Sequence, residues 1–429
     1  MAVDDERRLT ARDRRVNIIA AFSRELDARN PYSAASGLRE LIAGEAPRPM
    51  IVSGDIDGLV SAAMLRSAAP GWDAVALIVK SGTVYLHPDV VDGIDLADCF
   101  GVDVYSTYIP NVSNHVALWG GKKAGASSEA LAAAQAYDAV VRERAQKTLL
   151  ATPSLWAGIE GSYGEAGKRP RSAGYRYPLG TAQILLAMLE VIGHSPKMFD
   201  REYLPWLVAN CDGGLKTIRD YPHNVPMWWS ALAAAVGPAS LSEQVYQVAA
   251  NQRPVEFVDI VNRLRAESHL VKDFEALKPA HLRRDPPAEH LDDSWNLRTQ
   301  GIADVAPVVD WISGLSGWPD PFRGGAQSLQ DWTAVPLATA GRLLTSGLPT
   351  GATAQERIEK YKAHLRHSLG AVHTNFAFFD MSQRLGWVAP WDGAQVPDLA
   401  ALPDALMPSQ DLFDEEPEVG DEDPASIVI

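Results

Sequence analysis

Cysteine is scarce in this chain: among its 429 residues, only Cys99 and Cys211 are cysteines. Two cysteines supply neither a disulfide framework nor a cysteine-rich zinc site, which excludes the small secreted scaffolds that depend on such links. No apolar run approaches the length that crosses a bilayer, and the first residues lack the apolar core of a signal peptide. We therefore expect a cytoplasmic protein without membrane attachment.

Positive charge is also in short supply. Lysine and arginine number 39 against 54 acidic residues, and the net charge of −15 argues against broad binding to duplex nucleic acid. Part of the acidic excess is local, because residues 397–429 are rich in proline and acidic residues. We expect this stretch to be a disordered acidic tail. With apolar residues such as Leu412 and Phe413 set among its charges, such a tail suits docking to a basic protein partner.

The remaining composition, with 46% hydrophobic and 22% charged residues, is that of a soluble globular protein. The length predicts more than one domain. The pattern of the chain predicts N-terminal helices, an α/β domain, a mostly helical second domain and the tail. Their expected ranges are 1–46, 47–230, 231–396 and 397–429. Short apolar runs alternate with helical patterns near the start of the α/β domain, which predicts a mainly parallel sheet. The expected strands are 50–52, 72–79, 84–86, 102–105 and 116–119.

The clearest chemical signal lies at the end of the first of these strands. Met50–Val52 form an apolar run, Ser53 and Gly54 end it, and Asp55 and Asp57 precede Gly58 and a helix expected from Leu59. This order places the two carboxylates at the carboxyl end of a parallel strand, where open α/β sheets bind ligands. Carboxylate oxygens there suit Mg²⁺ or Mn²⁺. The same residues also fit an ordinary Asp-Gly turn with a helix N-cap.

This stretch resembles motif I of the DHH phosphoesterase superfamily, in which a strand ends in Asp-x-Asp-Gly and runs into a helix containing Ser-Ala. The resemblance implies further motifs in order. The motif II candidate is Asp103, and its competitors are Asp89, Asp92, Asp95 and Asp98. Where the family has Asp-His-His, this chain has Ser113-Asn114-His115, so only His115 matches.

Two later stretches extend the resemblance. Tyr177–Gly193 is similar to the family's Ser/Thr-Ala helix, and Asp212-Gly213-Gly214 is similar to motif IV. The alternative for Asp212 is an ordinary Asp-Gly turn. The resemblance therefore covers roughly residues 48–230.

The resemblance implies hydrolysis of a phosphodiester or phosphoanhydride, with a Mn²⁺ or Mg²⁺ pair as cofactor. The implied metal ligands are Asp55, Asp57, Asp103, His115 and Asp212. Among them, Asp57 and His115 have the implied catalytic roles. The expected substrate is a nucleotide or a short single-stranded nucleic acid. A glycine-rich basic loop would contact its phosphates through Lys168, Arg169, Arg171 and Arg176.

Two other functions fit the same residues. Ser113 and Asn114 stand in place of metal ligands, so the chain is alternatively a binding or regulatory module that has lost the chemistry. Ser53–Gly58 also resembles the phosphate loop of the PP-loop ATP pyrophosphatases, but Asp55 replaces a glycine there and places a carboxylate against a phosphate.

Three weaker features lie elsewhere in the sequence. Two glycine pairs, in Trp119–Lys122 and Arg323–Ala326, fit either a phosphate-binding loop or plain turns. We interpret His364, His367 and His373 as surface residues, since no carboxylate completes a metal set with them.

Overall fold

The computed structural model of the chain describes sixteen stretches, and every structural statement below concerns these residues alone. They are 11–44, 46–79, 83–92, 94, 98–106, 109–114, 141–143, 145–157, 179–196, 204–209, 211, 225–251, 301–336, 338–342, 377–381 and 384–388. Several sequence-predicted features lie outside them. These are the strand at 116–119, the acidic tail, His115, Lys168, Arg169, Arg171, Arg176, Asp212 and the histidines after residue 363.

The centre of the described fold is a seven-stranded sheet with the order β6-β5-β4-β1-β2-β3-β7. Its strands are β1 (Met50–Ser53), β2 (Ala74–Val79), β3 (Thr83–Leu86), β4 (Phe100–Val102), β5 (Asn111–Val112), β6 (Leu150–Ala151) and β7 (Thr333–Pro336). All neighbours from β6 to β2 are parallel, whereas β3 and β7 are added antiparallel. The predicted α/β class with a mostly parallel sheet is therefore confirmed.

The central strands are buried on both faces, which explains why their sequences are continuous apolar runs. In β1, Met50 and Val52 join a large core under the helices, and Ile51 joins a smaller core on the opposite face. Pairing with β2 shifts between Met50 and Ile51, whose partners are Ala74 and Ala76. The shift marks a bulge, which adds a residue and bends the strand locally.

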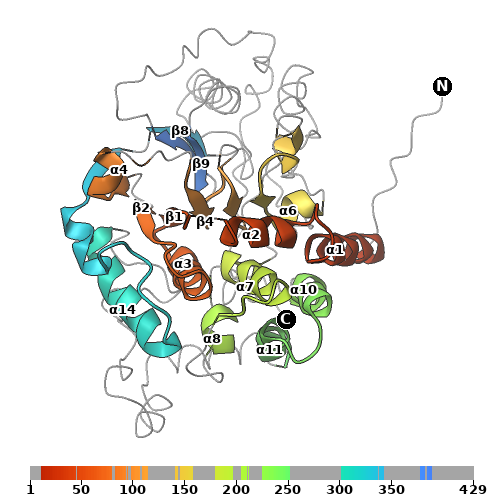
Figure 1. Ribbon diagram of the computed structural model, residues 1–429. Coiled ribbons are helices and arrows are strands. Elements are labelled where there is room, and N and C mark those ends of the chain that lie inside the picture. Colours follow the sequence, from red (N-terminus) through yellow and green to blue (C-terminus); the bar gives the residue numbers. More distant parts are fainter. Residues whose placement is uncertain are drawn as a thin grey trace, which may run out of the picture.

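Helices cover one face of the sheet and share the large core. They include α1 (Ala11–Glu25), α2 (Ala34–Ile42), α3 (Ile56–Ala68), α7 (Thr181–Val191), α8 (Leu204–Ala209), α10 (Ser230–Val236), α11 (Leu241–Ala250) and α14 (Val305–Ser316). Figure 1 shows α3, α7, α8, α11 and α14 below the sheet, with α4 (Pro88–Asp92), β8 (Ala338–Arg342) and β9 (Ala377–Met381) above it. The remaining elements are β10 (Arg384–Val388), α6 (Pro153–Trp156), a π-helical turn (Val225–Trp229) and 3₁₀ turns (Ile302–Asp304 and Ala326–Asp331). Strands β8, β10 and β9 form a separate antiparallel sheet.

Helices α3 and α7 lie side by side and run in the same direction. At their starts, the backbone N–H of Thr181 donates to the Asp57 carboxylate. At their far ends, His194 Nδ1 lies 3.4 Å from the carbonyl oxygen of Ala68. Both N-termini therefore lie at the carboxyl end of the parallel strands. Because the N-terminus of a helix carries a partial positive charge, the two helices together favour negative charge there.

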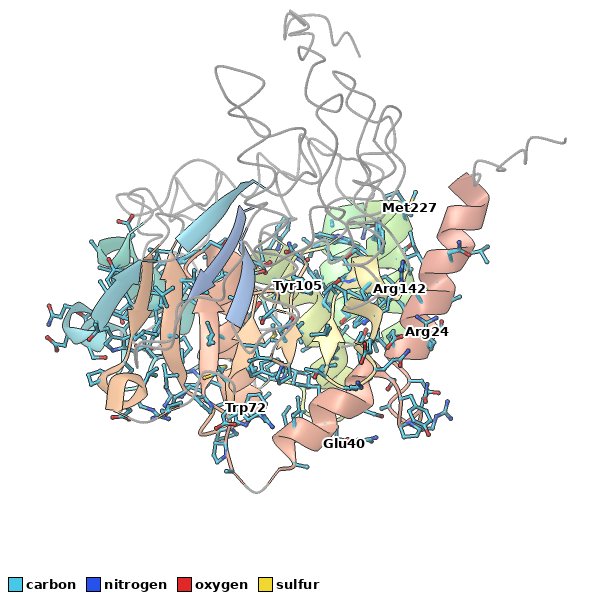
Figure 2. The ribbon with its side chains drawn as sticks, turned by 90° about the horizontal axis from the view of Figure 1, so that it is seen from above. Arg24, Glu40, Trp72, Tyr105, Arg142 and Met227 are labelled. Atoms are coloured by element: carbon cyan, nitrogen blue, oxygen red, sulfur yellow. The ribbon has the colours of Figure 1, made fainter. Side chains whose placement is uncertain are left out.

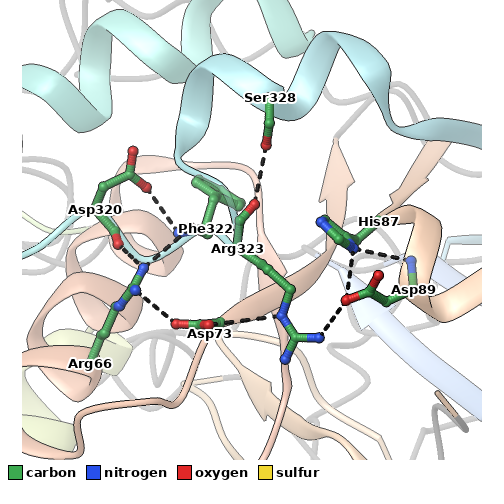
Figure 3. A network of polar contacts seen from close by, with 8 residues as sticks. All are labelled: Arg66, Asp73, His87, Asp89, Asp320, Phe322, Arg323 and Ser328. Atoms are coloured by element: carbon green, nitrogen blue, oxygen red, sulfur yellow. Dashed lines mark hydrogen bonds and ion pairs between the residues drawn. The ribbon is translucent and has the colours of Figure 1, made fainter.

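Residues 301–336 return to the α/β body and pack against it (Figure 3). From α3, Arg66 donates to the carbonyl oxygens of Asp320 and Phe322 and pairs with Asp73 at 2.9 Å. Helix α14 packs on α3, and β7 pairs with β3. Residues 231–251 and 301–336, which fall within the range expected for a second domain, thus pack into the core of the preceding residues, and β7 extends their sheet.

The Arg323-Gly324-Gly325 turn lies within residues 301–336. Arg323 Nη1 lies 2.9 Å from Asp89 Oδ2, and the Arg323 backbone N–H donates to the Ala74 carbonyl at 3.0 Å. Both glycines have positive φ, of 76° and 83°. Figure 2 shows Trp72, before β2, and Tyr105, after β4, toward opposite ends of the strands. The turn lies at the Trp72 end, away from Asp55, so it is not a phosphate loop for a site at the carboxyl ends.

Within the described ranges, no helix has both the length and the apolar character needed to cross a membrane.

Candidate functional site

The candidate site lies where the order of the parallel strands reverses. From β1 the chain passes through α3 to β2 on one side, and it then returns to β4 on the other side of β1. A crevice forms outside the carboxyl ends of the strands at such a switch point, and open α/β sheets bind ligands there. Asp55 and Asp57 follow β1, and Asp103 follows β4. The described carboxylate candidates therefore flank the switch point.

The Asp-x-Asp-Gly stretch builds a tight strand-to-helix turn. Asp55 is the N-cap of α3 and accepts a hydrogen bond from the Gly58 N–H at 3.1 Å. The cap starts the helix at Ile56, earlier than the expected Leu59, so Asp55 precedes the helix and Asp57 lies in its first turn. A Cβ atom at Gly58 would lie 2.3 Å from the Ser53 carbonyl oxygen. Only glycine fits at this position without movement of the backbone.

Asp57 is fully buried and caps a second helix. Its Oδ2 accepts the Thr181 N–H at 2.6 Å, and its Oδ1 accepts the Ala182 N–H at 2.9 Å. These N–H groups open α7, where they have no partner inside the helix. The N-cap of α7 is Gly180, which has no side chain, and a Cβ atom there would lie 3.0 Å from Asp57 Oδ2. Asp57 therefore fills the place of a capping side chain from outside the helix.

Asp103 has an unusual backbone conformation. Its φ of 54° is left-handed, and its N–H donates to the Val112 carbonyl at 2.9 Å. Strand β4 accordingly ends at Val102 rather than continuing to residue 105 as expected. The left-handed conformation interrupts the side-chain alternation of the strand, and Asp103 Oδ1 accepts a 2.6 Å hydrogen bond from Thr181 Oγ1. Left-handed conformations of residues other than glycine concentrate at functional sites.

Thr181 joins these carboxylates to the end of β5. Besides donating to Asp103, its Oγ1 accepts the Asn114 N–H at 3.0 Å. We call the set Asp57, Asp103, Asn114 and Thr181 the Thr181 junction. All of its members are at most 4% exposed. The junction therefore fixes the ends of β1, β4 and β5 around the start of α7.

The two candidates outside the described residues follow directly on this region in the sequence. His115 follows Asn114, which belongs to the Thr181 junction. Asp212 follows Cys211, whose carbonyl oxygen would lie 3.1 Å from a Cβ atom at Gly180. The described chain thus passes the candidate site immediately before each of these residues.

The described residues by themselves do not form a metal centre. Within the described ranges, no three His, Cys, Asp or Glu side chains are grouped so that they could hold an ion. The junction supplies buried carboxylates, of a kind that fits Mg²⁺ or Mn²⁺, but fewer than such ions take. A complete ligand set would need residues beyond the described ranges, and His115 and Asp212 are the candidates for it.

Sequence reasoning identified Asp55, Asp57 and Asp103 but missed Thr181 and Gly180. A signal for them was present. The apolar helix after residue 180 begins with Gly-Thr, and glycine offers no capping side chain. Such a helix start requires a cap from elsewhere in the chain, and a nearby acidic motif is a suitable source.

Comparisons of the chain with protein-family models, with curated proteins and with solved structures gave no match.

Proposed function

We propose that the protein is a divalent-metal-dependent phosphoesterase of the DHH type. Its substrate would be a phosphodiester or phosphoanhydride of a nucleotide or short single-stranded nucleic acid. The observation that carries this proposal is the Thr181 junction at the switch point of the sheet. It gathers the segments in which the resemblance expects motifs I, II and III and the helix before motif IV.

The proposal gives each candidate a role. Asp55, Asp57, Asp103, His115 and Asp212 would hold Mn²⁺ or Mg²⁺, which when bound supplies charge stabilisation at the phosphoryl group. The amides of α7 hold the Asp57 carboxylate in one orientation. The basic side chains of Lys168, Arg169, Arg171 and Arg176 would bind phosphate oxygens of the substrate. Burial of the junction would strengthen the attraction between its carboxylates and a bound cation, because charges attract more strongly away from water.

A second candidate function is a binding or regulatory module that has kept this fold without the chemistry. One observation favours it. Both oxygens of Asp57 accept backbone N–H groups, so the buried charge is stabilised by the protein without an ion. Ser113 and Asn114 in place of Asp and His agree with the same function. The PP-loop alternative has no such support, because the Asp55 carboxylate caps the helix where that loop would present amides to a phosphate.

Titration calorimetry with Mn²⁺, together with hydrolysis assays on dinucleotides, short oligonucleotides and polyphosphate, tests the proposal. We expect Mn²⁺ to bind and to support hydrolysis in the parent protein. Asp103→Asn and Asp212→Asn should weaken both, whereas Asp98→Asn, at an exposed competitor position, should leave both unchanged. Absence of both Mn²⁺ binding and hydrolysis in the parent would contradict the enzyme and leave the binding module.

We also propose that the chain has a mostly helical second domain and a disordered acidic tail. Helices α11 and α14, and all of α10 except its first residue, fall within the expected range 231–396, and they pack in the core of the α/β body. For the tail, we expect that removing residues 410–429 leaves the thermal unfolding temperature nearly unchanged, because this acidic stretch has few apolar residues to bury. A clear loss of stability on truncation would show that the tail packs on the body.

A further inference from the structure

Both the backbone N–H and the side-chain hydroxyl of Thr181 form hydrogen bonds at the candidate site. Its backbone N–H holds Asp57, and its hydroxyl both donates to Asp103 and accepts from the Asn114 backbone. The side chain is fully buried. We propose that Thr181 is the positioning residue of this site, which sets the carboxylates of Asp57 and Asp103 relative to the chain that leads into His115. This inference rests on the proposed metal-dependent function.

The hydrogen-bond pattern fixes the direction of the hydroxyl. A hydroxyl group has one hydrogen to donate. Since Thr181 Oγ1 receives the Asn114 N–H, its own hydrogen is directed to Asp103 Oδ1, 2.6 Å away. A carboxyl oxygen accepts this bond. The hydroxyl of Thr181 therefore holds the Asp103 carboxyl group in one orientation.

The threonine side chain is suited to holding this geometry. Its branched Cβ restricts χ1, so the hydroxyl has few alternative directions. Its backbone is anchored at the first turn of α7, which lies against α3. By contrast, Asp103 follows a short strand in a left-handed conformation and depends on contacts for its orientation. Because Thr181 is fixed by the packing of α7 on α3, its hydrogen bond restrains the orientation of the Asp103 carboxylate.

The strength of the proposed role follows from how supporting residues act at metal sites. Removing a group that orients a metal ligand lowers metal affinity about 10–100-fold. Thr181→Val keeps the shape of the side chain and removes the hydroxyl, so it isolates this effect. Thr181→Ser keeps the hydroxyl and removes the methyl group. A matched control is Thr152→Val, at a buried threonine that caps α6 by accepting the Leu155 N–H at 3.2 Å.

The experiment measures Mn²⁺ affinity by titration calorimetry and folding by thermal unfolding for the parent and these variants. We expect Thr181→Val to bind Mn²⁺ about tenfold more weakly or worse. Thr181→Ser should stay within about threefold of the parent, because it retains the donor. Thr152→Val should bind as the parent does. If Thr181→Val does not fold, Thr181→Cys keeps a similar size with a weak donor, and its affinity should still fall measurably.

The possible failures are distinct. If the parent itself binds no Mn²⁺, both the metal-dependent function and the role of Thr181 are overturned. If the parent binds Mn²⁺ and folded Thr181→Val, or Thr181→Cys in its place, binds it equally well, only the role of Thr181 is overturned. A Thr181→Ser variant as weak as Thr181→Val would assign the effect to packing of the methyl group and would also overturn the inference.

Discussion

At the scale of single residues, backbone amides compensate the buried charge of Asp57. An ionised carboxylate away from water is costly unless hydrogen bonds or opposite charges offset it. Here the Thr181 and Ala182 N–H groups donate to it, and the N-termini of α3 and α7 both lie beside it. The presence of this carboxylate is therefore explained without a cation. A ligating Asp57 would add metal binding to this structural role, and titration with Mn²⁺ measures it.

Gly58 gives a residue-scale prediction. We expect Gly58→Ala to lower the free energy of unfolding by about 1–3 kcal/mol, because the new Cβ atom must displace the Ser53 carbonyl. Gly37→Ala is the matched control in another helix, α2, since its Cβ atom would lie an ordinary 3.5 Å from Leu149 Cδ1. The control should be neutral or stabilising by up to about 1 kcal/mol. Urea unfolding of both variants checks this, and equal effects would contradict the close packing of the turn.

Asp320 gives a prediction about pH. Burial raises the pKa of its carboxyl above 3.8, against the lowering effects of the Ala326 and Phe322 amides and of Arg66. A raised pKa means that the folded protein holds this proton more tightly than the unfolded chain. The stabilisation is complete below pH 3.8 and is lost as the pH rises through the folded-state pKa.

Asp320→Asn removes this titration and provides the reference. The parent's free energy of unfolding, minus that of the variant, should fall as the pH rises above 3.8, the value for the unfolded chain. Urea unfolding at a series of pH values measures this difference. A difference that grows with pH would show that the amides and Arg66 outweigh burial.

At the scale of elements, α7 is tied by carboxylates at both ends. Asp57 caps its start, and Glu190 in its last turn caps α11. There, Glu190 Oε1 accepts the Leu241 N–H at 2.5 Å, and Oε2 accepts the Ser242 N–H at 2.9 Å. Helices α3, α7 and α11 are thus connected in series by side chains that satisfy the free amides of the next helix.

Glu190→Ala tests this series. We expect it to lower the free energy of unfolding by about 1–2 kcal/mol, because the first amides of α11 lose their acceptor. Loss of a glutamate as such is controlled by Glu40→Ala, at an exposed position on α2, which should change stability by less than about 0.5 kcal/mol. Chemical denaturation of the pair measures the difference, and an equally small effect of Glu190→Ala would show that water caps α11 as well.

The sequence predicted the elements whose signal is local. β1 and β2 are continuous apolar runs, and α7 is an apolar stretch closed by Gly193, so their patterns suffice. It did not predict β5 or β7. β5 has two residues, too few to show a period, and β7 is a strand only because it pairs with β3, far away in the sequence. Local patterns do not contain such pairings.

The candidate site likewise has a part that the local sequence predicts and a part that depends on long-range packing. Asp55 and Gly58 act within one turn, and their positions follow from the motif. The meeting of Asp57 with the start of α7, and of Asp103 with Thr181, depends on how α7 packs on α3. The sequence indicated which carboxylates to examine, but it did not show that a threonine holds them.

At the scale of the whole molecule, residues 301–336 pack against elements from the first hundred residues of the chain. Residues 301–336 place α14 on α3 and β7 beside β3, and Ala74 hydrogen-bonds to both Pro321 and Arg323. Arg66 adds contacts from the end of α3. The sheet and the core of the first half of the chain are thus complete only when residues 301–336, far away in the sequence, pack against them.

The place of β7 has a consequence for fragments of the protein. A chain ending at residue 251 would leave the outer backbone groups of β3 without their partners and available to another molecule. We expect this fragment to self-associate with increasing concentration, and a peptide of residues 301–336 added in trans to suppress the association. Light scattering during size-exclusion chromatography measures both effects. A fragment that stays monomeric would show that β3 does not associate with other molecules when β7 is absent, and would contradict this prediction.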